Sequence, residues 1–268
     1  MINLQHIKDI IRTLFELEII LGKYKIGDGS DILNFKDLKL LSIEGHEYIV
    51  FLYNNRVIKI HRNHLQSIYA LNEENVLSLI GIPTKRILMP TDPLYNLNKN
   101  IVGYVMVPVF QTGKNIYEES MDSFLNEINI IYCDMNILNE ELVLLKDIHP
   151  GNAIFNGKIY IVDSGRYVNA NVLLSPYIDL DNKNIKMVVK DNNIDEINSF
   201  LYRYIMNCIL SNLGKSTKIS CLMKVKKYFE TKSSEMGTTR YIDIVEHECN
   251  RNMTVIEYAK TLKNIIDI

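Results

Sequence analysis

Residues 147–152 read DIHPGN, and residues 161–165 read IVDSG. Two short β-like runs, 153–155 and 158–162, lie between and around these stretches and are joined by an Asn156-Gly157 turn. A single Asp or Asn carries little information, because both are common in turns. As a set, these residues combine a proton acceptor with hard oxygen atoms, the ligands that Mg²⁺ prefers. The stretch therefore predicts a β-hairpin whose two ends carry a chemical site.

The 268-residue chain is 47% apolar and 23% charged, with a formal net charge of −2. This composition excludes a disordered chain and argues against a protein that works by neutralising nucleic-acid phosphates. No apolar run reaches about 18 residues, and the charges within residues 1–20 fit neither a signal peptide nor a membrane span. The four cysteines show neither CxxC nor zinc spacing, which is typical of a reducing compartment. We expect a cytoplasmic protein with neither a nucleic-acid nor a membrane partner.

The part of the chain before residue 110 is rich in β-like runs. We expect strands at 39–43, 48–53, 56–61, 86–89 and 101–110, and one helix over 64–80 that ends at Gly81. Asn54-Asn55 is a plausible tight turn, because asparagine tolerates positive φ. The pattern predicts a small, mainly antiparallel sheet with one internal helix.

The part after Gly113 has helical periodicity. Helices are expected at 118–142, 195–213, 219–231 and 254–266. An amphipathic helix over 2–21, followed by a linker, precedes the sheet. The expected organisation is an α+β, bilobal chain. It consists of an N-terminal helix and linker packed on the rest (1–35), a β-rich lobe (36–110) and an α-helical lobe (111–268).

The 147–165 stretch resembles the signature of the protein-kinase-like superfamily, in which a catalytic Asp, four residues and an Asn precede a DFG-type Asp-x-Gly. The resemblance implies that Asp147 is the catalytic base and that Asn152 and Asp163 hold Mg²⁺. ATP would then be the phosphate donor. His149 would either contact the γ-phosphate or pack within the loop.

The upstream sequence contains the partners that this resemblance requires. Residues 57–60 read VIKI on the third expected strand and resemble the V-A-I-K motif, so Lys59 would contact the α- and β-phosphates. Glu73 on the following helix resembles the glutamate that pairs with this lysine, and Glu74 is the rival position. Residues 104–109 resemble the fifth strand and the hinge between lobes. The expected nucleotide contacts, besides Lys59, are Gly45, Val57, Met106, Val107, Val109 and Ile154.

Further matches extend the resemblance over residues 38–266, most like a small bacterial kinase. Asp195 and Asn198, expected to open a helix, resemble the D-x-x-S of the large central helix. The stretch from Arg251 to Glu257 resembles R-P-T-x-x-E. The chain departs from the family pattern in its glycine-rich loop, where only Gly45 remains, and at Ser164, which replaces the phenylalanine of DFG.

The resemblance leaves the acceptor open. The helical C-terminal part favours a Ser or Thr hydroxyl of a protein substrate, while DIHPGN is closer to aminoglycoside- and choline-type small-molecule kinases. A pseudokinase that acts as a nucleotide-binding or regulatory scaffold is the alternative from another class. The reduced glycine loop, Ser164 and Val57 favour it, whereas the intact set of Lys59, Glu73, Asp147, Asn152 and Asp163 opposes it.

Overall fold

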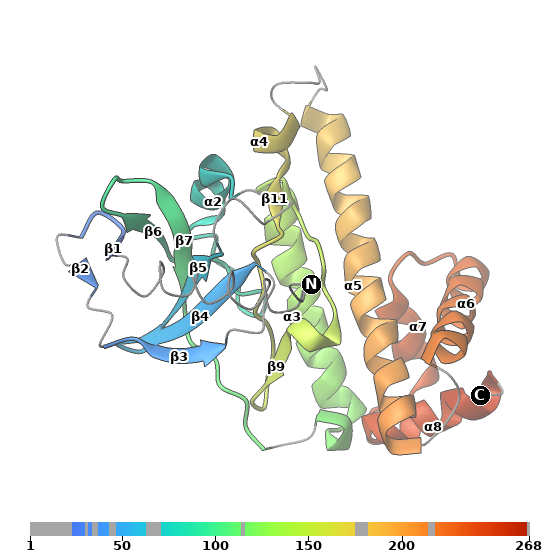
Figure 1. The fold of residues 1–268 in the computed structure, drawn as a ribbon. Helices are drawn as coiled ribbons and strands as arrows, with labels where there is room; N and C mark the ends of the chain where they lie inside the picture. Colours follow the sequence, from blue (N-terminus) through green and yellow to red (C-terminus); the bar gives the residue numbers. More distant parts are fainter. Residues whose placement is uncertain are drawn as a thin grey trace, which may run out of the picture. The chain divides into compact units, whose positions relative to one another are not determined.

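The computed structural model describes residues 23–29, 32–33, 37–42, 47–62, 71–113, 116–174, 182–213 and 218–266 (Figure 1). Within these ranges the chain is α+β, with a seven-stranded sheet and the α-helices α2 to α8. The expected helix over 2–21, the first part of the expected helix over 64–80, and Gly45 lie outside the described residues.

Two compact units divide the described residues. The first unit comprises the described part of Met1–Ile82 together with Met89–Pro108. The second unit comprises Pro83–Leu88 and the described residues of Val109–Ile268. Each unit is considered by itself below.

The first unit is built on an antiparallel sheet with strand order β2-β1-β6-β7-β5-β4-β3 (Figure 1). Its strands are β1 (Tyr24–Ile26), β2 (Ile32–Leu33), β3 (Lys39–Ser42), β4 (Tyr48–Tyr53), β5 (Arg56–His61), β6 (Asp92–Asn96) and β7 (Ile101–Met106). The helix α2 (Glu73–Leu79) belongs to the same unit and buries Val76 and Leu79. The antiparallel sheet that the sequence predicts is therefore confirmed.

The β4–β5 hairpin forms as the sequence predicts. Asn54 and Asn55 have φ of 44° and 57°, the left-handed region that a two-residue type I′ turn requires at both positions. The turn fixes the register, so that Tyr53 pairs with Arg56 and every pair up to Tyr48 and His61 follows.

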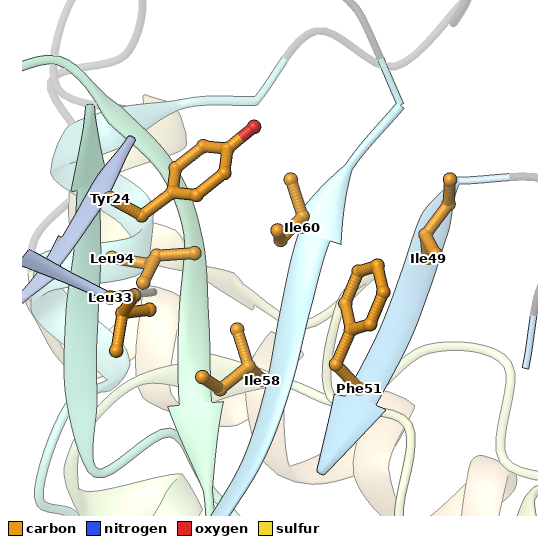
Figure 2. Packing of buried hydrophobic residues seen from close by; sticks show 7 residues of the cluster. All are labelled: Tyr24, Leu33, Ile49, Phe51, Ile58, Ile60 and Leu94. Carbon is orange, nitrogen blue, oxygen red and sulfur yellow. The ribbon is translucent and has the colours of Figure 1, made fainter. Parts of the chain in front are cut away.

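Alternating side chains of the sheet form one apolar cluster. Its members are almost fully buried and come from five strands, as Figure 2 shows: Tyr24, Leu33, Ile49, Phe51, Ile58, Ile60 and Leu94. In β4 and β5 they recur at every second position, which is the side-chain period of a strand. Tyr24, Leu33 and Leu94 show that β1, β2 and β6 complete this core.

The sequence pattern does not reveal three of these strands. β1 and β2 have three and two residues, too few for a period-2 signal. The expected strands leave out residues 92–96, and Pro93 and Asn96 are typical of turns. That omission is wrong: β6 pairs with β1 and β7, and its Leu94 is fully buried.

A glycine allows β7 to approach β5 closely. A Cβ on Gly103 would lie 2.0 Å from the carbonyl oxygen of Lys59 and 3.2 Å from the Cα of Ile60. These neighbours are backbone atoms of a paired strand and cannot move aside as a flexible side chain would. Gly103 thus sets the separation of the two strands at Lys59.

The second unit is mainly helical. Its helices are α3 (Met121–Glu140), α4 (Ala170–Leu174), α5 (Asn182–Leu213), α6 (Lys218–Met236), α7 (Tyr241–Glu248) and α8 (Val255–Ile265). The helix α5 contacts α3, α6, α7 and α8 and forms the centre of this unit (Figure 1). The helices expected at 118–142, 219–231 and 254–266 are confirmed as α3, α6 and α8. A capping box of Thr254 and Glu257 fixes the start of α8.

The helix α5 begins earlier than its sequence indicates. A start near Asp195 was expected, but Asp195 lies inside the helix, which begins at Asn182. Met187 and Val188 are more than half exposed in these first turns, so apolar residues do not mark one clear face. Ile185 and Val189 nevertheless pack against Ala170, which stabilises this extension.

Short strands connect the helices of the second unit. These are β8 (Val143–Leu144), which pairs with β11 (Val168–Asn169), and the hairpin of β9 (Ala153–Phe155) and β10 (Ile159–Ile161). The 3₁₀ helices η2 (Ile116–Glu118) and η3 (Pro150–Asn152) precede α3 and β9. The hairpin that the DIHPGN and DSG stretches flank is therefore confirmed.

Residues 86–89 do not form the expected strand. The buried carboxylate of Asp134 on α3 accepts hydrogen bonds from the backbone N–H groups of Lys85, Arg86 and Ile87. The amides of Arg86 and Ile87 are therefore not available to a ladder, and Ile87 makes an isolated bridge to Ile161. The Arg86 guanidinium in turn binds Glu127 of α3 through two hydrogen bonds, which raise the pKa of Arg86.

In the described part of the chain, none of the helices combines the length and apolar character needed to span a membrane.

Replacing Gly103 by alanine should lower the free energy of unfolding by at least about 2 kcal/mol, because the new methyl group would force β5 and β7 apart. Gly113→Ala is the control, since a Cβ there meets no atom within 4 Å and φ is not positive. It should change the free energy of unfolding by less than about 0.5 kcal/mol. Urea unfolding measures both variants, and equal midpoints would contradict the close approach.

Asp134→Asn should lower the free energy of unfolding by about 2–4 kcal/mol, because the amide group loses acceptor capacity toward three backbone N–H groups. Asp122→Asn on the same helix is the matched control. Its carboxylate pairs with Arg251 at 3.0 Å, but both side chains are about half exposed. This control should lose less than about 1 kcal/mol in the same urea titration.

Candidate functional site

Two polar side chains of α5 bond to the backbone of the loop that carries Asp147. Asn193, which is fully buried, accepts a hydrogen bond from Leu145 N (2.7 Å) and donates to Val143 O (2.8 Å). Glu196, one turn later, accepts from Ile148 N at 3.2 Å. The loop is therefore fixed on both sides of Asp147.

Asp147 itself has a left-handed backbone conformation, with φ of 61°. Few residues other than glycine adopt this region, and Asp and Asn are the most tolerant of them. Such a conformation persists only where the surrounding contacts impose it, and it is frequent at functional sites. The bonds to Leu145 and Ile148 supply that constraint.

Hydrogen bonds join Asp147 to Asn152 and Asn152 to the residue that precedes Asp163. Asn152 Nδ2 donates to the carbonyl oxygen of Asp147 at 3.0 Å. Asn152 O in turn accepts from Val162 N at 2.9 Å, which places the neighbouring Asp163 beside Asn152. The Asp163 carboxylate accepts from Gly165 N at 3.4 Å. The structure thus brings Asp147, Asn152 and Asp163 together at the ends of the β9–β10 hairpin.

Two cationic or polar groups flank the carboxylate of Asp147. Arg166 Nη1 lies 3.3 Å from Asp147 Oδ2, and His149 Nε2 lies 3.7 Å from Asp147 Oδ1. His149 Nδ1 accepts a hydrogen bond from Gly151 N, so in the neutral ring the proton resides on Nε2, toward Asp147. A Cβ on Gly151 would come within 2.9 Å of the imidazole, so the ring position requires glycine there.

The buried phenol of Tyr167 is affected by the carboxylates of the candidate site. Tyr167 is 1% exposed. Burial raises the pKa of its phenol, and the carboxylates of Asp163, Glu196 and Asp147 raise it further. Burial also raises the pKa of Glu196, with a further contribution from Asp147 that the hydrogen bond from Ile148 opposes. The carboxylates of Asp163, Glu196 and Asp147 therefore all act on Tyr167.

The donor set fits a magnesium ion shared with phosphates. In the described ranges, no group of three or more His, Cys, Asp and Glu side chains is arranged to hold a metal ion by itself. Mg²⁺ usually keeps its own waters and takes one or two protein oxygens besides those of the phosphates. Asn152 and Asp163 could supply that number of oxygens.

The expected phosphate and adenine residues of the first unit lie on two paired strands. Lys59 of β5 stands opposite Tyr104 of β7, and Val57 stands opposite Met106. Paired residues, and residues two apart in a strand, share one face of the sheet. Lys59 is only 8% exposed, and its Nζ lies 5.8 Å from the centre of the Tyr104 ring. These four residues form one surface with a cation beside apolar groups.

Glu73 is not joined to Lys59 by an ion pair among the described contacts. It is the first residue of α2, it is exposed, and its Oε1 accepts a hydrogen bond from Ile101 N at 3.2 Å. Glu74, the rival position, is exposed as well. The contact of Glu73 therefore attaches the start of α2 to β7.

The remaining expected nucleotide contacts fall in both units. Val107 is 55% exposed, and the division between the units falls between Pro108 and Val109. Val109 is partly exposed in the second unit. Ile154 lies on β9, is partly buried and pairs with Tyr160. Gly45 lies outside the described residues.

Three residues of this arrangement were not found from the sequence: Arg166, Asn193 and Glu196. The motif expected on the central helix pointed instead to Asp195 and Asn198. Asn198 bonds Tyr132 Oη, Tyr241 N and Thr239 O, so it joins helices and does not hold the loop. The sequence could have indicated Asn193 and Glu196 together, because they are three residues apart and share a helix face.

No protein-family model matches the chain, and no match was found among curated protein sequences.

Glu196 should make the stability of the protein depend on pH. Its pKa is raised above the ordinary value of 4.5 in the folded state, so the folded protein holds the proton more tightly than the unfolded chain. This contribution is present below pH 4.5 and is lost as the pH rises through the folded pKa. In Glu196→Gln, the amide oxygen still accepts the hydrogen bond from Ile148 N. Because the amide does not ionise, the protein does not lose this stability as the pH rises.

The gain in unfolding free energy of Glu196→Gln over the native chain should therefore grow between about pH 4 and pH 7. Urea titrations across this range measure it. Glu141→Gln, which changes an exposed side chain at the end of α3, should show no such trend. A gain in unfolding free energy that does not change with pH would contradict the raised pKa of Glu196 in the folded protein.

Proposed function

We propose that the protein is an ATP- and Mg²⁺-dependent phosphotransferase that moves the γ-phosphate to a hydroxyl. The observation that carries the proposal is the bond of Asn152 to Asp147, together with the bond of Val162, the residue before Asp163, to Asn152 within the second unit. These are the residue types, in the order and spacing, that the resemblance to the protein-kinase-like superfamily requires. A Ser or Thr hydroxyl of a protein is the acceptor that the sequence favours.

In this proposal Asp147 is the catalytic base. Arg166 and His149 flank its carboxylate and orient it, while Asn193 and Glu196 fix the loop from beneath. The acceptor hydroxyl gives its proton to this carboxylate as its oxygen forms the bond to the γ-phosphorus. The bond between the γ-phosphorus and the bridging oxygen breaks, and ADP leaves with that electron pair.

Asn152 and Asp163 would hold the metal, which, when bound, neutralises the charge on the phosphates. In the first unit, Lys59 would bind the α- and β-phosphates. Val57 and Met106 would offer apolar contact to the adenine, because they share one sheet face with Lys59. Glu73 would support Lys59 only after giving up its bond to Ile101 N.

Asp147→Asn and Asp163→Asn should each lower the rate of phosphate transfer at least about 100-fold. Asparagine is used at position 147 because it tolerates the positive φ found there. Labelled ATP and Mg²⁺ are incubated with the chain, and ADP and labelled protein are measured. Asp195→Asn, an exposed carboxylate of α5, is the matched control and should keep the native rate within about twofold.

Native rates in Asp147→Asn and Asp163→Asn would contradict the proposal. The same assay tests the second candidate, a nucleotide-binding scaffold, which the contact of Glu73 with Ile101 N favours. A scaffold would bind ATP without forming ADP, and its binding would be unaffected by Mg²⁺ and by the change at Asp163.

A further inference from the structure

The second unit contains a cavity of about 510 Å³ beside the Asp147 loop. Pro150 and Gly151 of η3 form part of its wall, and the other walls come from the segment after β7, from β9 and from α5. Volumes of this size are typical of sites for small molecules. The proposed base and metal ligands do not line it, so the mechanism above leaves the cavity without a role.

The floor of the cavity is aromatic and apolar. Ile116, Phe155 and Tyr204 are each less than 9% exposed, and the Tyr117 ring lies 5.5 Å from that of Tyr204, centre to centre. Phe124 and Phe200 pack behind Tyr204 at 5.5 and 5.4 Å and hold the ring in place. A flat ring could therefore bind against preformed aromatic surface.

The described residues of the rim are polar and uncharged. Gln111 and Thr112 are exposed at the mouth, and Asn207 lies on α5 one turn after Tyr204. Side-chain amides and a hydroxyl both donate and accept hydrogen bonds, so they suit hydroxyl or amide groups of a ligand. Thr112 N also donates to Phe155 O at 3.2 Å, which ties the rim to β9.

Among the residues that the structure describes, the lining contains no Asp, Glu, Lys, Arg or His. Burial raises the pKa of Tyr117 to about 12 and raises that of Tyr204 as well, so both phenols stay neutral at physiological pH. A charged ligand would lose its water here without gaining a counter-charge, which is costly. The lining therefore selects against polycationic and anionic molecules.

We infer that this cavity is a binding site for an uncharged small molecule that carries an aromatic ring and hydroxyl or amide groups. The ring packs on Phe155, Tyr117 and Tyr204, and the polar groups bond to Gln111, Thr112 and Asn207. Gly151, in the wall, donates its N–H to His149, which lies beside Asp147. A ligand in the cavity thus contacts the same loop that carries the proposed base.

The test uses 2-(2-naphthyl)ethanol as the probe, with the full chain and without nucleotide. The chain has no tryptophan, so naphthalene fluorescence excited above the tyrosine band is observed without interference. Saturable binding with a Kd of about 1 mM or tighter is expected. The ammonium analogue 2-(2-naphthyl)ethylamine should bind at least about tenfold more weakly, because the lining offers it no carboxylate.

Two variants fill the cavity from different sides. Asn207→Phe places a ring over the floor from α5, and Gly113→Leu fills the mouth from a position where a side chain meets no neighbour within 4 Å. Each variant should raise the Kd for 2-(2-naphthyl)ethanol at least about tenfold. Ser211→Phe, one turn further along α5 at an exposed position, adds the same ring outside the cavity and should keep the native Kd within about twofold.

Equal affinity for the alcohol and the ammonium probe, or native affinity in both Asn207→Phe and Gly113→Leu, would overturn the inference. Gly113→Leu keeps the test decisive if Asn207→Phe fails to fold, which circular dichroism would show. Because no nucleotide is present, the outcome does not depend on whether the protein transfers phosphate.

Discussion

One buried side-chain amide, that of Asn193, holds the candidate site in place. It bonds to Leu145 N and Val143 O at the start of the Asp147 loop and also donates to Asn139 Oδ1 of α3 at 2.8 Å. A buried amide is costly unless both its donors and its acceptor are bonded, and here they are. The position of the loop, the left-handed conformation of Asp147 and the contact of Asn152 with Asp147 O all depend on this connection between α5, β8 and α3.

The carboxylates of α3 perform a similar task elsewhere in the second unit. Asp134 binds the amides of residues 85–87, and Glu127 binds both Arg86 and Ile159 N of β10. The hairpin that leads to Asp163 is thereby attached to α3. Buried polar groups, fully paired, fix the loops that an apolar core alone would leave without a defined position.

The parts of the fold that local chemistry decides could be predicted from the sequence. Asn54-Asn55 specified its hairpin through the φ values it tolerates. Helical periodicity over 254–266 predicted α8, whose start the capping box of Thr254 and Glu257 fixes. β6 was missed because its Pro93 and Asn96 are typical of turns, and only tertiary pairing reveals that Leu94 is buried. In the site, spacing identified Asp147, Asn152 and Asp163, whereas Arg166 and Asn193 act through contacts between distant segments that no local pattern shows.

The positive φ of Asp147 narrows the ways in which this position can change over evolution. A replacement must satisfy the backbone before any chemistry is considered, and outside glycine only Asn fits as well as Asp. Ala, Ser or Glu would cost folding stability as well as the proposed base. A descendant that loses the proposed base is therefore expected to carry Asn or Gly at this position, whereas the backbone at Asp163 does not limit the tolerated residues in this way.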